Sequence, residues 1–167
     1  MIHWMKSVFA SVFFLFSLQS VGQAHEITIK VSGLENEQVI VGYHLGKQRL
    51  VYDTIQSTGE GEVMIKGVGE LPQGVYFLYA NTFYFEFLIK EQQFQLSLDK
   101  TTAYSSMTVE GSVENELFGN FQRQMGVLQR EQKQLADSLN GLSGDDSIAV
   151  RQKFVDIAQE MSVIRSS

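Results

Sequence analysis

The chain has 167 residues and a mass of 18.9 kDa, enough for one domain with a sizeable core or for a small domain with an appendage. Its net charge of −6 and pI near 5.0 argue against nucleic acid as a partner, because neutralising phosphates needs a surplus of Lys and Arg. The chain has no cysteine, which excludes disulfides, thiolate metal sites, thiol nucleophiles, a CxxC redox pair and a lipidated cysteine anchor.

Residues 1–24 have the pattern of a secretory signal. Lys6 supplies a positive charge, Ser7 to Leu18 is apolar, and small residues precede a cleavage point after Ala24. The apolar stretch is about a dozen residues, whereas a membrane-spanning helix needs roughly 20. We therefore expect a cleaved signal, a mature chain that begins near His25, no stable membrane span after cleavage, and export to the periplasm or cell envelope.

Residues 26–110 alternate apolar with polar side chains and are rich in β-branched and aromatic residues between glycine and asparagine turns. This pattern predicts eight short strands near residues 26–32, 39–44, 49–57, 63–66, 75–80, 83–89, 94–98 and 107–109. Frequent turns with no helix between the strands favour an antiparallel β-sandwich over a parallel α/β fold. We assign residues 25–111 to this sandwich domain.

The hydrophobic period changes after Gly111, where Ser112 is expected to cap a helix. Spacings of three and four connect the apolar positions of a first helix, Phe118, Phe121, Met125, Leu128, Leu135 and Leu139, with the polar Gln132 among them. A second helix repeats the pattern at Val150, Phe154, Ile157, Met161 and Ile164. The two helices predict an α-helical hairpin over residues 112–167, either packed on the sandwich or projecting from it. Because the second apolar stripe continues to Ile164 with no cap after it, we expect a truncated linker.

Aromatic side chains concentrate in the predicted hairpin of residues 75–89. We expect one face, formed by Phe83, Phe85, Phe87 and Ile89, to belong to the core. The other face carries Tyr84 and Glu86, with Tyr76 expected opposite Tyr84. These three residues, Tyr76, Tyr84 and Glu86, are the candidate interaction surface, and the alternative is that their face packs under the helical hairpin.

Other polar motifs have structural explanations. His44 has no carboxylate near it in sequence, so we expect a surface or rim histidine. Asp145 and Asp146 lack the spacing of a calcium loop and fit helix capping instead. The glycines of residues 67–74 lack the spacing of a phosphate-binding loop. We therefore assign no catalytic, cofactor-binding or metal-binding residue, expect no cofactor, and expect that the chain is not an enzyme.

Four runs of residues carry a family resemblance: Gly74 to Leu78, Phe85 to Ile89, Gln92 to Asp99, and Val109 to Phe118. Over about residues 26–120, the chain resembles the uncharacterised β-rich N-terminal domain that precedes thioredoxin-like domains, of the AhpC/TSA or TlpA type, in bacterial envelope thiol-disulfide oxidoreductases. In that family the β-rich domain is followed by a helical linker and a thioredoxin fold that carries the CxxC motif. This chain has the first two parts only, so the resemblance implies no redox residue here.

Two functional hypotheses follow. The first is a noncatalytic exported accessory or docking module that serves a thioredoxin-like domain or another envelope protein. The second is an autonomous envelope sandwich that binds a small ligand or a surface polymer between its aromatic strands. An enzymatic role has little support, because no nucleophile, base and orienting group assemble from the sequence.

Overall fold

The computed structural model describes residues 24–139 and 145–166. The expected signal segment, except Ala24, and the connection between the two helices therefore lie outside the described residues. In chain order, the elements are β1 (Ala24–Ser32), β2 (Gln38–Leu45), β3 (Gln48–Gln56), β4 (Glu62–Val68), β5 (Gly74–Ala80), β6 (Phe83–Ile89), β7 (Gln93–Asp99), the short 3-10 helix η1 (Ala103–Ser105), β8 (Thr108–Glu110), α1 (Val113–Leu139) and α2 (Asp145–Ser166). The strands and both helices match the sequence prediction, and η1 was not predicted.

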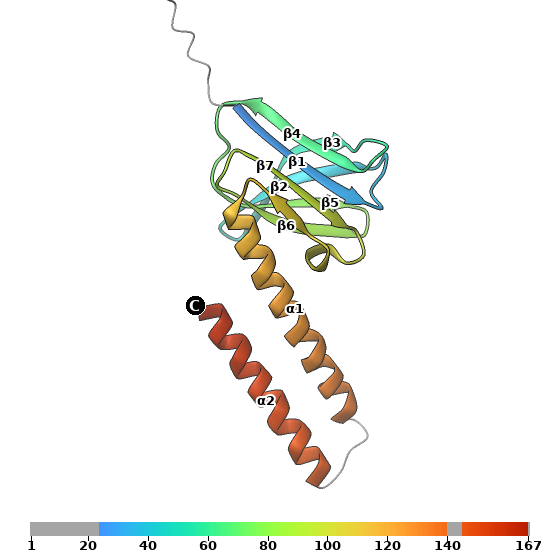
Figure 1. The fold of residues 1–167 in the computed structure, drawn as a ribbon, viewed down its shortest axis with the longest axis vertical. Helices are drawn as coiled ribbons and strands as arrows, with labels where there is room; N and C mark the ends of the chain where they lie inside the picture. Colours follow the sequence, from blue (N-terminus) through green and yellow to red (C-terminus); the bar gives the residue numbers. More distant parts are fainter. Residues whose placement is uncertain (1–23, 140–144, 167) are drawn as a thin grey trace, which may run out of the picture.

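The strands form two four-stranded sheets that pack into a β-sandwich (Figure 1). The strand order is β4-β1-β7-β8 in sheet A and β3-β2-β5-β6 in sheet B. Sheet B is antiparallel as predicted, but sheet A is mixed because β1 pairs with β7 in parallel. A parallel pair needs a long crossover connection, and five intervening strands supply it here. Hairpin spacing along the chain gave no sign of this pairing between distant strands.

The inner faces of both sheets form one core. Its largest fully buried side chains include Phe85 and Phe87 from sheet B and Ile27, Ile29 and Leu96 from sheet A. These positions are the alternate residues of each strand, as the period-two pattern predicts. The predicted core face of β6 is thereby confirmed, since Phe83, Phe85, Phe87 and Ile89 are all buried.

The outer faces of the two sheets differ in chemistry. On sheet A, Lys66 pairs with Glu26 at 2.7 Å, and Lys30 pairs with Glu60 at 2.8 Å. Sheet B exposes large apolar and aromatic side chains instead, with Val51, Tyr79 and Tyr84 exposed to 64%, 45% and 40%. Sheet A thus presents ion pairs with the exposed aliphatic residues Met64 and Val68 beside them, and sheet B presents exposed aromatic rings.

The helices project from one end of the sandwich as an elongated arm (Figure 1). The N-terminal part of α1 contacts η1, β6 and β8, whereas α2 packs along α1. Met125, Leu128, Ile157 and Met161 form the buried seam between the helices, with Phe121, Leu135 and Ile164 partly buried around it. The predicted helical hairpin is therefore confirmed, and it forms a small hydrophobic cluster separate from the sandwich core.

Side chains from η1 and α1 fasten the arm to the edge of sheet B. The buried side-chain amide of Asn115 accepts a hydrogen bond from the Leu88 N–H and donates one to the Leu88 carbonyl, both at 2.8 Å. The Tyr104 hydroxyl makes the same double contact with the backbone of Glu86, at 3.1 and 3.0 Å. These bonds satisfy backbone groups on the outer side of edge strand β6, which would otherwise be open to another strand.

Candidate functional site on sheet B

The candidate site is a cluster of side chains on the outer face of sheet B, built around Phe77. This residue is only 6% exposed although it points away from the sandwich core. Its ring lies over Gly42, where an added Cβ would come within 2.3 Å of the ring. Glycine at this position of β2 therefore allows an aromatic ring to rest directly on the sheet, and neighbouring side chains cover it.

Three polar side chains surround that ring. His44 Nε2 lies 3.1 Å from Glu86 Oε1 and 3.2 Å from the Tyr84 hydroxyl oxygen. The Tyr84 hydroxyl donates a hydrogen bond of 2.6 Å to the same Glu86 oxygen. Burial first, and then this bond to a carboxylate, raise the pKa of Tyr84 to about 12. The hydroxyl therefore remains a proton donor to Glu86 at neutral pH.

Arg49 lies over the Tyr84 ring of the cluster. It pairs in register with His44 across β3 and β2, and its guanidinium carbon lies 5.3 Å from the centre of the Tyr84 ring. The Tyr84 ring in turn stacks on Phe77 at 5.6 Å between centroids. Cation–π contacts of this kind hold a cation over a ring face and contribute about 0.5–1 kcal/mol at exposed sites. The cluster thus presents a positioned cation on an aromatic support.

The arrangement of the cluster has features of a recognition surface. Glu86 and His44 contact each other and the Tyr84 hydroxyl, with side chains 27% and 24% exposed. A flat face of aromatic rings with a few fixed polar groups is typical of binding surfaces, in which Tyr and Arg often contribute most of the affinity. We therefore treat this cluster as a candidate interaction site.

The structure separates the three residues that sequence reasoning had grouped. Tyr84 and Glu86 lie together on the outer face, but the placement of Tyr76 opposite Tyr84 is wrong. Tyr76 pairs with Phe87, is 2% exposed in the core, and donates a hydrogen bond to the Pro72 carbonyl. The residue across from Tyr84 is Tyr79. The helices leave this face uncovered, so Tyr84 does not pack beneath the helical hairpin.

The sequence analysis did not identify Tyr79 or Arg49 as residues of the site, and it did not predict that His44 contacts Glu86. The two-residue turn at Asn81 and Thr82 fixes Ala80 opposite Phe83, and hence Tyr79 opposite Tyr84, so counting back from the turn would have found this pair. No comparable signal existed for His44 and Glu86. They are 42 positions apart on strands that do not pair with each other, and only the order of strands in sheet B brings them together.

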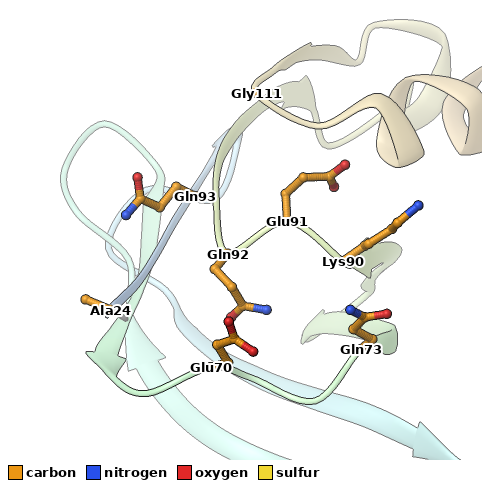
Figure 2. Close-up of a pocket in the computed structure, with 8 residues that line it drawn as sticks. All are labelled: Ala24, Glu70, Gln73, Lys90, Glu91, Gln92, Gln93 and Gly111. Carbon is orange, nitrogen blue, oxygen red and sulfur yellow. The ribbon is translucent and has the colours of Figure 1, made fainter. Parts of the chain in front are cut away.

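A second candidate is a hollow of about 430 Å³ at one end of the sandwich (Figure 2). It is lined by Ala24, Glu70, Gln73, Lys90, Glu91, Gln92, Gln93 and Gly111. Several of these polar groups serve local structure. Gln92 bonds to both backbone groups of Leu71, and Glu91 accepts a hydrogen bond from Ser112 at 2.7 Å. Because these contacts fix loops and the start of α1, we prefer the face of sheet B as the candidate site.

Two further properties of residues 24–139 and 145–166 concern metal binding and membrane insertion. Within these ranges, no three His, Asp or Glu side chains lie in a group that could hold a metal ion. None of the helices described is both long enough and apolar enough to cross a membrane.

One family model matches the sandwich together with the first residues of α1. The model of a family described as a domain of unknown function, DUF4369, matches residues 25–118. No curated protein matches the chain. Among solved structures, 5-hydroxyisourate hydrolase of Klebsiella pneumoniae is similar at 18% identity with a TM-score of 0.33, over 53% of this chain and 99% of that one. A likeness at that score supports no conclusion about activity.

Proposed function

The chain belongs to the DUF4369 family of domains of unknown function, and on that premise we propose that it is a noncatalytic docking module of an exported protein. The observation that carries this proposal is the contrast between the two sheets. Sheet A carries ion pairs and exposes the aliphatic residues Met64 and Val68, whereas sheet B leaves Tyr79, Tyr84 and Val51 exposed around a fixed polar cluster. Exposed aromatic surface on one face is typical of a site that another protein covers.

We further propose that the docked partner is a thioredoxin-like domain. The support is the resemblance to envelope proteins in which a β-rich domain precedes such a fold, together with the absence of cysteine from this sequence. In this arrangement the redox chemistry belongs to the partner, and this chain positions the partner or its substrate. The signal-like residues 1–24 support the same setting, because they predict export to the cell envelope.

Binding to a purified thioredoxin-like domain tests this proposal. We expect calorimetry to detect an interaction that the substitution Tyr79→Ser weakens at least tenfold, because it removes an exposed ring from the docking face. Met64→Ser is the matched control, since Met64 is 44% exposed on the outer face of sheet A. A lack of binding, or equal weakening by both substitutions, would contradict the proposal.

The alternative function, a ligand held between aromatic strands, receives less support. β5 and β6 are neighbours in one sheet, and their inner side chains fill the core, with Leu78, Phe85 and Phe87 exposed by 1% or less. A ligand would have to bind on the outer face or in the hollow of Figure 2. Thermal unfolding measured with envelope saccharides would reveal such binding as a rise in melting temperature that grows with ligand concentration.

A further inference from the structure

We propose that Arg49 is the anchor of the docking face and receives a carboxylate from the protein partner, presented between apolar side chains. The inference rests on the proposed docking function and names the chemistry that the partner shows to sheet B.

The guanidinium of Arg49 is held in place while its donors stay free. The Tyr84 ring lies beneath it, and that ring rests on the buried Phe77. Within the described residues, no hydrogen bond or ion pair of the Arg49 guanidinium is found. A cation already fixed over a ring loses less side-chain entropy on binding than a free one.

The one acidic group of the cluster does not neutralise Arg49. Glu86 turns toward His44 and Tyr84, and its Oε1 contacts both of them. Glu86 Oε1, His44 Nε2 and the Tyr84 hydroxyl are therefore engaged with one another in the free protein. A partner carboxylate gains new charge-assisted hydrogen bonds at the Arg49 guanidinium.

The Arg49 guanidinium favours an anion as the partner group, although the strands of sheet B also carry two acids, Asp53 and Glu86. Arg49 is the only Lys or Arg residue in its four strands, β2, β3, β5 and β6. A single planar guanidinium matches a single carboxylate through two parallel N–H to O bonds. Val51, two residues along β3 from Arg49, and Tyr79, opposite Tyr84 on β5, are exposed, so the carboxylate that fits best is flanked by apolar groups. An Asp or Glu set among apolar residues of a protein surface meets this requirement.

Benzoate is a simple probe of this chemistry, because it combines a carboxylate with an apolar ring. In NMR titrations of the full chain, we expect benzoate to shift the Arg49 Nε–Hε signal and the Tyr79 and Tyr84 amide signals at millimolar concentration. Benzamide, which has the same shape without the charge, should bind at least fivefold more weakly. Inorganic phosphate should shift Arg49 less than benzoate does, since it lacks the apolar part.

Variants separate the anchor from general anion binding. Arg49→Gln should abolish the benzoate response while the melting temperature and the Phe77 signals stay near those of the parent chain. Arg130→Gln is the matched control on the exposed surface of α1 and should leave the response intact. The proposal is overturned if benzoate shifts Arg49 no more than Arg130, if benzamide binds as well as benzoate, or if phosphate binds more tightly.

The same variants distinguish this inference from the proposed function. If the thioredoxin-like domain binds and Arg49→Gln leaves its affinity within twofold, docking stands and the anchor is wrong. If benzoate binds at Arg49 while no thioredoxin-like domain binds, the anion site stands and the proposed partner is wrong. If Arg49→Gln weakens both interactions at least tenfold, both proposals are supported.

Discussion

At the scale of single residues, the structure depends on polar side chains that bond to the backbone of distant strands. Asn115 is fully buried, and its amide matches the N–H and the carbonyl of Leu88. Its backbone N–H is in turn capped by the Ser112 hydroxyl at 3.1 Å, as the sequence predicted for Ser112. One turn of helix therefore both begins α1 and attaches it to sheet B.

The substitution Asn115→Asp tests this contact with little change in size. At neutral pH, a carboxylate would face the Leu88 carbonyl, and we expect the free energy of unfolding to fall by about 2–3 kcal/mol. Near pH 4 a protonated Asp can donate to that carbonyl again, so part of the loss should be recovered relative to the parent chain. Urea unfolding at both pH values measures the difference. An equal loss at pH 4 and pH 7 would show that the hydrogen bond to the carbonyl is not the cause.

A second prediction at this scale concerns Tyr104 and the stability of the protein at alkaline pH. Burial raises its pKa to about 12, above the ordinary value of 10.0. The neutral phenol is therefore favoured in the folded state, and its stabilising effect is present below pH 10 and is lost as the pH rises toward 12. We expect Tyr104→Phe to be less stable at pH 8, because it loses both bonds to Glu86, but to lose less stability than the parent between pH 10 and pH 12. Parallel stability curves for the two proteins would contradict this.

At the scale of elements, β2 shows how one glycine organises a sheet face. The register between β2 and β3 shifts at Val41 and Gly42, where β3 carries an extra residue. Gly42 lies against the Leu50 carbonyl as well as Phe77, and an added Cβ would come within 2.6 Å of that oxygen. The lack of a side chain thus permits both the bulge and the aromatic cluster above it.

Two glycine-to-alanine substitutions should have opposite effects on stability. Gly42→Ala forces a methyl group against backbone and ring, and we expect a loss of about 1–3 kcal/mol or more. Gly126→Ala lies within α1, where the new methyl meets only the end of Arg130 at 3.5 Å, and we expect a gain of about 0.5–1 kcal/mol. Thermal unfolding of the two variants measures both effects. Stabilisation by Gly42→Ala would refute the tight packing described here.

At the scale of the whole molecule, the sandwich and the arm have separate cores. Among the residues that the structure describes, the sandwich buries twenty hydrophobic residues in one cluster, whereas the helices bury four between them. Because α2 packs along α1 and not along the strands, its stability depends on that short seam. The arm is therefore the part of the molecule with the lower local stability.

Substitution in the arm should leave the sandwich folded. We expect Ile157→Asn to increase hydrogen exchange throughout α2 and in the distal half of α1, because it places a polar amide in the buried seam. Protection of β1, β2 and β5 should stay within a factor of about two, which reflects independent cooperative units. Phe85→Ala is the contrasting variant. It removes a buried ring from the sandwich core and should increase hydrogen exchange in the strands of both sheets. Coincident loss of protection in strands and helices for Ile157→Asn would show a single cooperative unit instead.

The sequence by itself determined the strands and the two long helices of this protein, but not the short helix η1. Period-two alternation located all eight strands, and the change to helical spacing after Gly111 located the start of α1, because both signals depend on residues close together in the chain. The tertiary structure alone decided how strands from distant segments pair. That pairing made β1 and β7 parallel, moved Tyr76 into the core, and brought Arg49 over Tyr84 and His44 beside Glu86. These contacts depend on strand order, and local periodicity carries no information about which distant strands become neighbours.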